Sequence, residues 1–343
     1  MPAAFLPYGR QAIDDDDVAA VAAALRGEML TTGPLVDTFE AEFARAVGAE
    51  HAVVCNSGTA ALHLATLALG LGPGDVAIVP SVTFLATANC ARYVGAEVEF
   101  ADVDADTGLL GPRQLEEAIA RAARRGRPRM VLPVHLNGQA ATLGEVAAIA
   151  RRNGMTVVED ACHALGVDKV GSCAHADAIA FSTHPVKAIA TGEGGVLTCA
   201  DGGVAARARV LRSHGMVREP AEFVHRDAGF EDGQANPWYY EMQEPGWNYR
   251  LPDVLCALGI SQLAKLGAFH AKRCALADHY DAALAPLANV LRPVPRTAPA
   301  AHGWHLYVVL IDFDRIGVRR GEVMRRLRAR GIGTQVHYQP VHR

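Results

Sequence analysis

The sequence predicts an α/β protein, with a mostly parallel sheet that helices cover on both faces and a second, smaller α/β domain. Strand-like apolar runs alternate with segments of helical periodicity over roughly 200 residues, which is the pattern of βαβ units with right-handed crossovers. The chain has 343 residues, half of them hydrophobic, which suffices for about two domains. The pattern then changes from about residue 201, which places the second domain in the C-terminal part.

The elements of the larger domain follow from local signals. Helix 14–28 starts with aspartates, whose charge suits the N-terminal end of a helix dipole. Gly48 closes helix 36–48, and Pro112 stands in the first turn of helix 111–125. The expected strands are 51–56, 75–80, 97–104, 129–136, 156–162, 177–182 and 196–199, and the remaining helices are 57–70, 83–95, 142–154 and 203–215.

The C-terminal part begins with a polar, aromatic-rich segment, 219–253, which is too long for an ordinary connector and is therefore functional or flexible. A helical region over 254–287 follows, and then a β-α-β unit with its elements at 305–313, 319–331 and 334–340. We expect an N-terminal segment at 1–30, a large domain at 31–245 and a small domain at 246–343. Because the chain stops directly after the last expected strand, we expect this small domain to be incomplete.

Composition excludes several classes of protein. The net charge of −4 gives no basic surface for nucleic acid. The N-terminus lacks the pattern of a signal peptide, and no apolar run reaches the ~18 residues of a membrane helix. The seven scattered cysteines include no C-x-x-C pair, so we expect reduced thiols in the cytoplasm and no metal.

Candidate chemistry lies at the expected carboxyl ends of the strands, where open parallel sheets bind ligands. Ser57, Gly58 and Thr59 open a helix after the first strand, so their backbone N–H groups could hold an anion; alternatively, they form an ordinary N-cap. Asp160 ends another strand and is followed closely by His163. A carboxylate there needs a cationic or N–H partner, and its alternative is a structural or capping role.

Two more strand ends complete the pattern. Phe84 could stack on a flat cofactor, although core packing is the commoner role of phenylalanine. Ser182 offers a second hydroxyl for an anion, and Lys187 follows it in a glycine-rich loop, where a lone lysine is usually solvated. Together these groups are those that pyridoxal 5'-phosphate (PLP) requires: a phosphate cradle, a stacking ring, an acid for the pyridine nitrogen and a lysine for a Schiff base.

Several sequence blocks, in the same order, resemble the DegT/DnrJ/EryC1/StrS sugar-nucleotide aminotransferases. The resemblance runs from about Tyr8 to the end and implies fold-type I, the aspartate-aminotransferase-like fold with a mostly parallel seven-stranded sheet. Many blocks in one order are far more specific than any one motif. The blocks are LTTGP, NSGTAALHLA, VTFLATANC, VEDACHALG, FSTHPVKAIATGEGG, RSHGM, GWNYRLPDVLCALGISQL and VHYQPVHR.

The resemblance implies roles for these residues. Lys187 would bind PLP covalently, and Asp160 would keep the pyridine nitrogen protonated. Asn248 would reach the phosphate from a partner subunit, which requires a homodimer with shared active sites. Thr183, where relatives often have Phe, should affect packing more than chemistry. The implied cofactor contacts are Ser57, Gly58, Thr59, Phe84, Asp160, His163, Ser182, Lys187 and Asn248, and the implied sugar-nucleotide contacts are Tyr8, Met29, Leu30, Thr31, Thr32, Ser57, His184, Gln335, Val336, His337 and Tyr338.

Within the family, the blocks around Lys187, the RSHGM block and the Trp-Tyr segment before NYRLPD are most similar to enzymes of pseudaminic acid biosynthesis. This similarity implies transfer of the amino group of L-glutamate to C4 of a UDP-4-keto-6-deoxy-N-acetylhexosamine, giving UDP-4-amino-4,6-dideoxy-N-acetyl-β-L-altrosamine. Four alternatives stay open. A transaminase of the GDP-perosamine or dTDP-amino-sugar type differs only in a few loop residues. A 3-dehydratase carries histidine at the lysine position, an NAD-dependent oxidoreductase needs a G-x-G-x-x-G that is missing, and a non-catalytic protein of this fold would be colourless.

Overall fold

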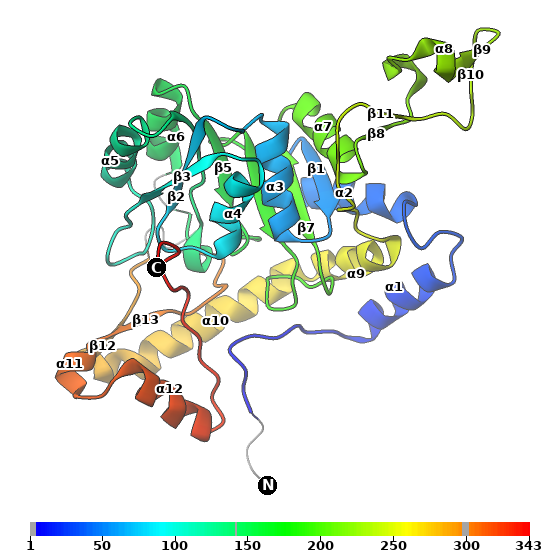
Figure 1. The fold of residues 1–343 in the computed structure, drawn as a ribbon. Helices are drawn as coiled ribbons and strands as arrows, with labels where there is room; N and C mark the ends of the chain where they lie inside the picture. The colour runs from blue at the N-terminus through cyan, green and yellow to red at the C-terminus, as the bar shows by residue number, and fades with distance from the viewer. Residues whose placement is uncertain (1–4, 141–142, 297–301) are drawn as a thin grey trace.

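The computed structural model describes residues 5–140, 143–296 and 302–343, and its centre is the predicted sheet (Figure 1). Seven strands lie in the order β1-β7-β6-β5-β4-β2-β3. Strand β7 pairs antiparallel with both of its neighbours, and the other pairs are parallel. The mostly parallel sheet is therefore confirmed. The strands are β1 (His51–Cys55), β2 (Asp75–Pro80), β3 (Glu97–Ala101), β4 (Arg127–Val131), β5 (Thr156–Asp160), β6 (Ala178–Ser182) and β7 (Gly195–Cys199).

Helices cover both faces of the sheet, because alternate strand residues enter two separate cores. Val54, Ile78 and Phe181 belong to one core, whereas Val53 and Val79 belong to the other. The first core is closed by α2 (Pro34–Val47), α5 (Pro112–Ala122), α6 (Leu143–Arg152) and α9 (Asp253–Ala264), and the second by α3 (Gly58–Ala68), α4 (Leu85–Tyr93) and α7 (Gly202–Arg212). Residue 142 of the expected helix 142–154 lies outside the described residues.

Helix α1 (Asp15–Leu25) lies against α9, far away in the sequence (Figure 1). Asp14 caps α1, and the buried Asp17 carboxylate accepts hydrogen bonds from Ser261 and Gln262. Burial opposes the charge of Asp17, but these bonds and Lys265 outweigh burial and lower its pKa to about 2. One buried carboxylate thus joins α1 to α9.

The aromatic-rich segment forms an arm that projects from the body (Figure 1). Short elements build it, and Trp238, Tyr240 and Met242 on it are more than half exposed. The elements are β8 (Met216–Val217), η2 (Pro220–Glu222), α8 (Arg226–Gly229), β9 (Phe230–Glu231), β10 (Gln234–Ala235) and β11 (Glu241–Met242).

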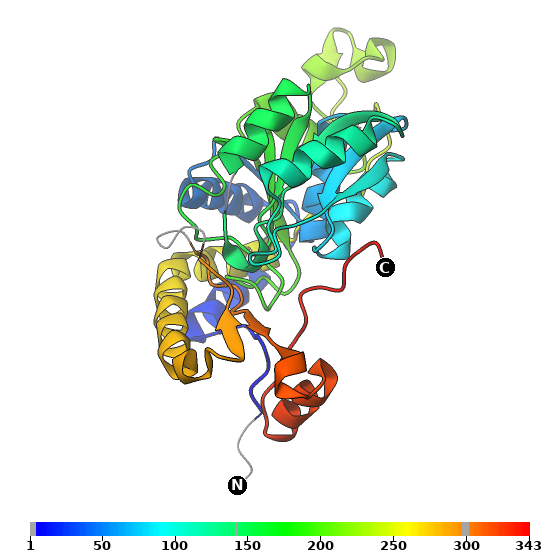
Figure 2. The same cartoon turned by 90° about the vertical axis from the view of Figure 1, so that its left-hand side faces the viewer.

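The end of the chain differs from the prediction. Residues 334–340 were expected to be a strand but form no strand, and 305–313 contains only the short β13. Strand β13 pairs antiparallel with β12, and a single bridge joins Ile332 to Leu6. The expected β-α-β unit is therefore wrong, because its last segment leaves α12 and runs toward the seven-stranded sheet (Figure 2). The remaining elements are η1 (Leu136–Gly138) after β4, and α10 (Leu266–Leu284), η3 (Ala285–Leu287), β12 (Leu291–Pro293), β13 (Val309–Ile311), α11 (Phe313–Ile316) and α12 (Arg320–Ala329) toward the end of the chain.

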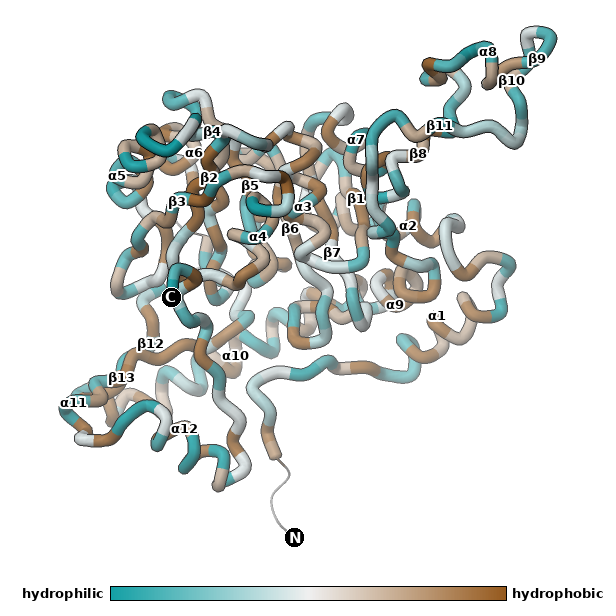
Figure 3. The backbone as a smooth tube through the Cα atoms, in the orientation of Figure 1, coloured by the Kyte–Doolittle hydropathy of each residue, from teal (hydrophilic) through white to brown (hydrophobic). Residues whose placement is uncertain are grey.

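Apolar residues concentrate on the central strands, and α12 is mostly hydrophilic (Figure 3). In the described parts of the chain, no single helix is both long and apolar enough to cross a membrane. The bent pair formed by residues 253–264 and 266–287 meets the length and composition requirement only when the two helices are taken together.

Candidate active site

One cavity of about 470 Å³ lies at the carboxyl ends of β5 and β6, beside the first turns of α3 and α4. It brings together most of the residues that the sequence nominated, although they come from positions 8 to 338. Those that line it are Tyr8, Ser57, Gly58, Thr59, Phe84, Asp160, His163, Ser182, His184, Lys187, Gln335, Val336, His337 and Tyr338.

The N-terminus of α3 forms one wall of the cavity. Ser57 is the N-cap, and its side chain accepts a hydrogen bond of 3.1 Å from the backbone N–H of Ala60. A methyl group on Gly58 would lie 2.9 Å from Ser182 Cβ and 3.1 Å from Cys162 Sγ. Glycine therefore lets α3 approach β6 closely. The capping and the anion-cradle interpretations are compatible, because free N–H groups of the first turn remain at the cavity.

Asp160 is the last residue of β5 and only 5% exposed. Each of its carboxylate oxygens accepts a hydrogen bond, one of 2.7 Å from the Thr87 hydroxyl and one of 3.1 Å from the Cys162 N–H. These donors offset the cost of removing a carboxylate from water, so Asp160 is suited to hold a negative charge in the cavity.

Lys187 lies in the turn between β6 and β7, which closes through a hydrogen bond from its N–H to the His184 carbonyl. It is half-buried and lines the cavity. Burial lowers the pKa of its ammonium, and Cys162 and Asp160 oppose this shift in part. Among the described residues, its amine has no ion pair or hydrogen bond. Lys187 therefore presents a partly desolvated amine that no described residue binds.

A cluster of aromatic rings lines the same cavity as Lys187. His163 Nε2 is 3.0 Å from the Tyr338 hydroxyl, and its ring is 4.2 Å from the ring of His305. Burial and then His305 lower the pKa of His163 well below its ordinary value, whereas burial raises the pKa of Tyr338. Both groups are therefore uncharged at neutral pH. The His163 Nδ1 atom is buried and has no hydrogen-bond partner within the described parts of the chain.

Two distant segments meet at the mouth of the cavity. Tyr8 is 5.5 Å from His337 between ring centroids, and Phe84 is 5.8 Å from Tyr338. Phe84 is 53% exposed, so its ring faces the open cavity and is not in the core. The position of Phe84 permits stacking on a ligand.

The loop 29–32 and Asn248 do not line this cavity. The loop residues are exposed, and the loop ends where the Asp253 side chain accepts a hydrogen bond of 2.8 Å from the N–H of Gly33. Asn248 is exposed beside the base of the arm, where its carbonyl accepts a hydrogen bond from the Asn56 side chain. Neither can act in the cavity of its own chain in this arrangement.

Sequence reasoning missed several residues of the site. Thr83 and Thr87 stand four residues apart in a quoted block, with Thr83 just before the N-cap Phe84 and Thr87 in the first turn of α4. His305 stands at the start of an expected strand, and no local signal in the sequence shows that it lines the cavity. Residues that line the cavity without having been nominated include Thr83, Cys162, Val186, Glu193 and His305.

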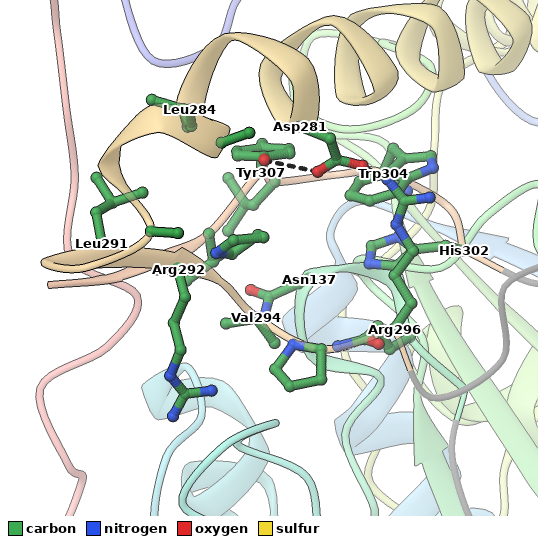
Figure 4. A pocket seen from close by; sticks show the side chains of 17 residues that line it. Asn137, Asp281, Leu284, Leu291, Arg292, Val294, Arg296, His302, Trp304 and Tyr307 are labelled. Atoms are coloured by element: carbon green, nitrogen blue, oxygen red, sulfur yellow. Dashed lines mark hydrogen bonds and ion pairs between the residues drawn. The ribbon is translucent and has the colours of Figure 1, made fainter.

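A second cavity of about 270 Å³ lies between α10, β12 and the loop at 137–139 (Figure 4). It contains none of the nominated residues. Trp304 and Leu306 line it, whereas His305 between them lines the first cavity. The extended segment at 302–307 therefore separates the two cavities.

Solved structures resemble the whole described chain. PseC from Helicobacter pylori, an aminotransferase involved in the biosynthesis of pseudoaminic acid, matches with a TM-score of 0.86 and 27% identity over 99% of this chain and 86% of that chain. Spr1654 from Streptococcus pneumoniae, in its PLP form, matches with a TM-score of 0.84 and 25% identity over 98% and 86%. The fold, the cavity and these similarities define a PLP-dependent sugar aminotransferase of fold-type I.

The sequence comparisons agree. Residues 11–343 match the DegT/DnrJ/EryC1/StrS aminotransferase family. The spore coat polysaccharide biosynthesis protein SpsC of Bacillus subtilis is 39% identical over 344 residues, with 98% of this chain and 84% of SpsC covered. The chain belongs to the DegT/DnrJ/EryC1/StrS aminotransferase family.

The residues present fit PLP. A methyl group on Gly58 would fill the space between α3 and β6, where the phosphate cradle is expected. The free amine of Lys187 and the doubly hydrogen-bonded carboxylate of Asp160 line the same cavity. These are the groups that a pyridine ring with an aldehyde and a phosphate requires.

Proposed function

We propose that this aminotransferase moves the amino group of L-glutamate to C4 of a UDP-4-keto-6-deoxy-N-acetylhexosamine, giving UDP-4-amino-4,6-dideoxy-N-acetyl-β-L-altrosamine. The observation that carries the proposal is the free, half-buried Lys187 amine in one cavity with the Asp160 carboxylate. The choice of sugar is supported by the sequence blocks around Lys187 and by the similarity to PseC.

Lys187, Asp160 and the start of α3 have distinct tasks. When bound, PLP supplies an aldehyde that bonds to an amine and a ring that withdraws electrons. Lys187 Nζ would hold the cofactor covalently and later, as a free amine, take the proton from Cα of the donor. Its lowered pKa favours the neutral amine that a general base needs. The negative charge of Asp160 would hold a proton on the ring nitrogen. The N–H groups of α3 and the Ser182 hydroxyl would bind the phosphate.

A second candidate is amino transfer to another nucleotide 4-keto sugar, of the GDP-perosamine or dTDP-amino-sugar type. SpsC, at 39% identity, is a protein of spore coat polysaccharide biosynthesis, and it is more similar in sequence than PseC at 27%. The assay that separates the two candidates uses a panel of UDP-, GDP- and dTDP-linked 4-keto sugars with L-glutamate. Turnover restricted to GDP or dTDP substrates would overturn the UDP proposal.

The Lys187→Ala variant tests the role of the lysine. The purified protein should be yellow with PLP, and the variant should lose the visible absorption band at neutral pH together with turnover. Lys272→Met, which changes an exposed lysine on α10, serves as a control and should keep both. A Lys187→Ala protein that retained the band and the turnover would refute the assignment.

We further propose a cytoplasmic homodimer in which loop 29–32 and Asn248 complete the partner's cavity. Both are exposed and outside their own cavity, and the arm beside Asn248 exposes Trp238 and Tyr240. The seven cysteines are all free thiols, as expected in a reducing compartment.

Mixing two inactive variants tests the shared sites. Lys187→Ala and Asn248→Asp damage different components of each site. After subunit exchange, half of the dimers are mixed and each has one intact site, so activity should recover to roughly a quarter of wild type. Absence of recovery, in a mixture shown to exchange subunits, would place both residues in one chain's own site.

A further inference from the structure

A chain of two hydroxyl groups leads to the Asp160 carboxylate. Thr87, in the first turn of α4, is fully buried, and its hydroxyl lies 2.7 Å from Asp160 Oδ2. The Thr83 hydroxyl lies 2.7 Å from that of Thr87. An ionised carboxylate can only accept, so Thr87 donates its single proton to Asp160, and Thr83 must then donate to Thr87. The donor and acceptor in each of these two hydrogen bonds are thus determined.

Thr87 donates a hydrogen bond of 2.7 Å to Asp160 Oδ2, and the backbone N–H of Cys162 donates one of 3.1 Å to Oδ1. The Cys162 thiol also interacts with this carboxylate. Since Asp160 is 5% exposed, water cannot replace a donor that is lost. A hydrogen bond to the charged form of a carboxylate favours that form, and bonds to a charged group are the stronger ones.

We propose that Thr87 is a positioning residue that holds the Asp160 carboxylate ionised and oriented toward the ring nitrogen of PLP. The proposal rests on the proposed function, because it takes Asp160 as the partner of that nitrogen. One proton is shared between the carboxylate and the nitrogen. The Thr87 hydrogen bond is stronger to the charged carboxylate than to a neutral carboxyl group, so it favours the arrangement with the proton on the nitrogen and increases the electron withdrawal of the ring.

The surroundings of Asp160 make this effect measurable. The titratable groups that interact with it are Cys90, Cys162, Tyr338 and Lys187. Burial raises the pKa of both thiols and of the tyrosine above their ordinary values, so these three stay uncharged near neutral pH. Lys187 itself interacts with His163, His305 and His337, and burial lowers the pKa of each of these rings below its ordinary value. Near and above neutral pH, the visible band of the Lys187-linked cofactor therefore reports the charge of its ring.

The experiment is a pH titration of that band in the holoenzyme. A ring nitrogen without its proton withdraws fewer electrons, so the linked nitrogen of Lys187 holds its own proton more tightly. Thr87→Val should raise the midpoint by about one pH unit, the equivalent of one charge-assisted hydrogen bond. Thr87→Ala provides a second variant without the hydroxyl should valine fail to fold. Thr87→Ser keeps the hydroxyl and should titrate like wild type.

Two reference variants distinguish an error in the role of Thr87 from an error in the assignment of Asp160. Thr66→Val removes an equally buried hydroxyl, which bonds to backbone carbonyls in α3 and α4, and should not move the midpoint. Asp160→Asn should raise the midpoint of the titration at least as much as Thr87→Val does. If Asp160→Asn shifts the midpoint but Thr87→Val and Thr87→Ala do not, the role of Thr87 is refuted and the proposed function stands. If Asp160→Asn has no effect, the assignment of Asp160 fails, and the role of Thr87 fails with it.

Discussion

Lys187 shows how a residue's surroundings decide its chemistry. A lysine in a glycine-rich loop is ordinarily solvated, yet this one is half-buried beside Asp160 and Cys162. The position of Lys187 between two strands could be predicted from the sequence, because β6 and β7 are strongly apolar. Its burial could not be predicted, because the cavity walls around it come from residues 8, 57–59 and 335–338.

The lowered pKa of Lys187 predicts a pH-dependent stability of the apoprotein. Between the folded pKa and the ordinary value of 10.5, the unfolded chain binds the proton and the folded chain does not, so stability rises with pH there. Lys187→Met lacks this dependence. Its free energy of unfolding should exceed that of wild type at pH 7, and the gap should shrink as the pH approaches 10. Urea unfolding of both apoproteins measures this gap.

Lys272→Met is the matched control, since Lys272 lies exposed on α10. Its difference from wild type should be the same at both pH values. A constant gap for Lys187→Met would mean that the site keeps its lysine as well hydrated as the unfolded chain does.

At the scale of elements, the close approach of α3 to β6 builds the phosphate side of the cavity. The first turn can present N–H groups to an anion only if no side chain stands in front of them, and at Gly58 there is no room for one. The sequence revealed this element well, because a small-residue helix start after an apolar strand is a local signal.

Gly58→Ala is predicted to weaken PLP binding. Its methyl group would press on Ser182 Cβ at 2.9 Å and force α3 away from β6. Overpacking of this kind costs about 1–3 kcal/mol, so binding should weaken about tenfold or more. Titration of the apoprotein with PLP, followed by the visible band, gives the affinity.

Gly267→Ala controls for the loss of a glycine in a helix start. No atom of the residues that the structure describes lies within 4 Å of the methyl group added in α10, so stability should rise by up to about 1 kcal/mol with unchanged PLP affinity. Equal affinities for Gly58→Ala and wild type would show that α3 does not hold the phosphate.

Segment 334–340 is an example of a secondary-structure element that the sequence predicts wrongly. Its apolar and polar residues suggest a strand, but none of its residues pairs as one, and the nearest bridge joins Ile332, two residues before the segment, to Leu6. The segment's side chains Gln335 to Tyr338 instead line the cavity. Contacts with a distant part of the chain hold such a segment extended, and these contacts cannot be predicted from the local sequence pattern. The direction of a strand within a sheet also depends on contacts between distant segments, and for this reason the sequence did not predict that β7 is antiparallel to its neighbours.

At the scale of the whole molecule, both ends of the described chain converge on one site. Leu6 donates a hydrogen bond to the Gly331 carbonyl and accepts one from the Gly333 N–H, both of 2.7 Å. Further on, the Val341 N–H donates to the Ser81 carbonyl at the start of the loop before α4. The N-terminal segment therefore fixes the path on which His337 and Tyr338 reach the cavity.

This arrangement predicts that one backbone hydrogen bond controls substrate binding. Leu6→Pro removes the N–H that donates to Gly331, whereas Leu6→Ala keeps it and changes only an exposed side chain. Losing the bond releases segment 332–338, so the KM for the nucleotide sugar should rise up to about tenfold in Leu6→Pro. The visible band should stay intact, because Lys187 and Asp160 do not depend on this segment. Leu6→Ala should stay within about twofold of wild type. Steady-state kinetics beside absorption spectra separates these effects, and equal KM values for the two variants would show that the pairing of the chain's ends does not position the substrate.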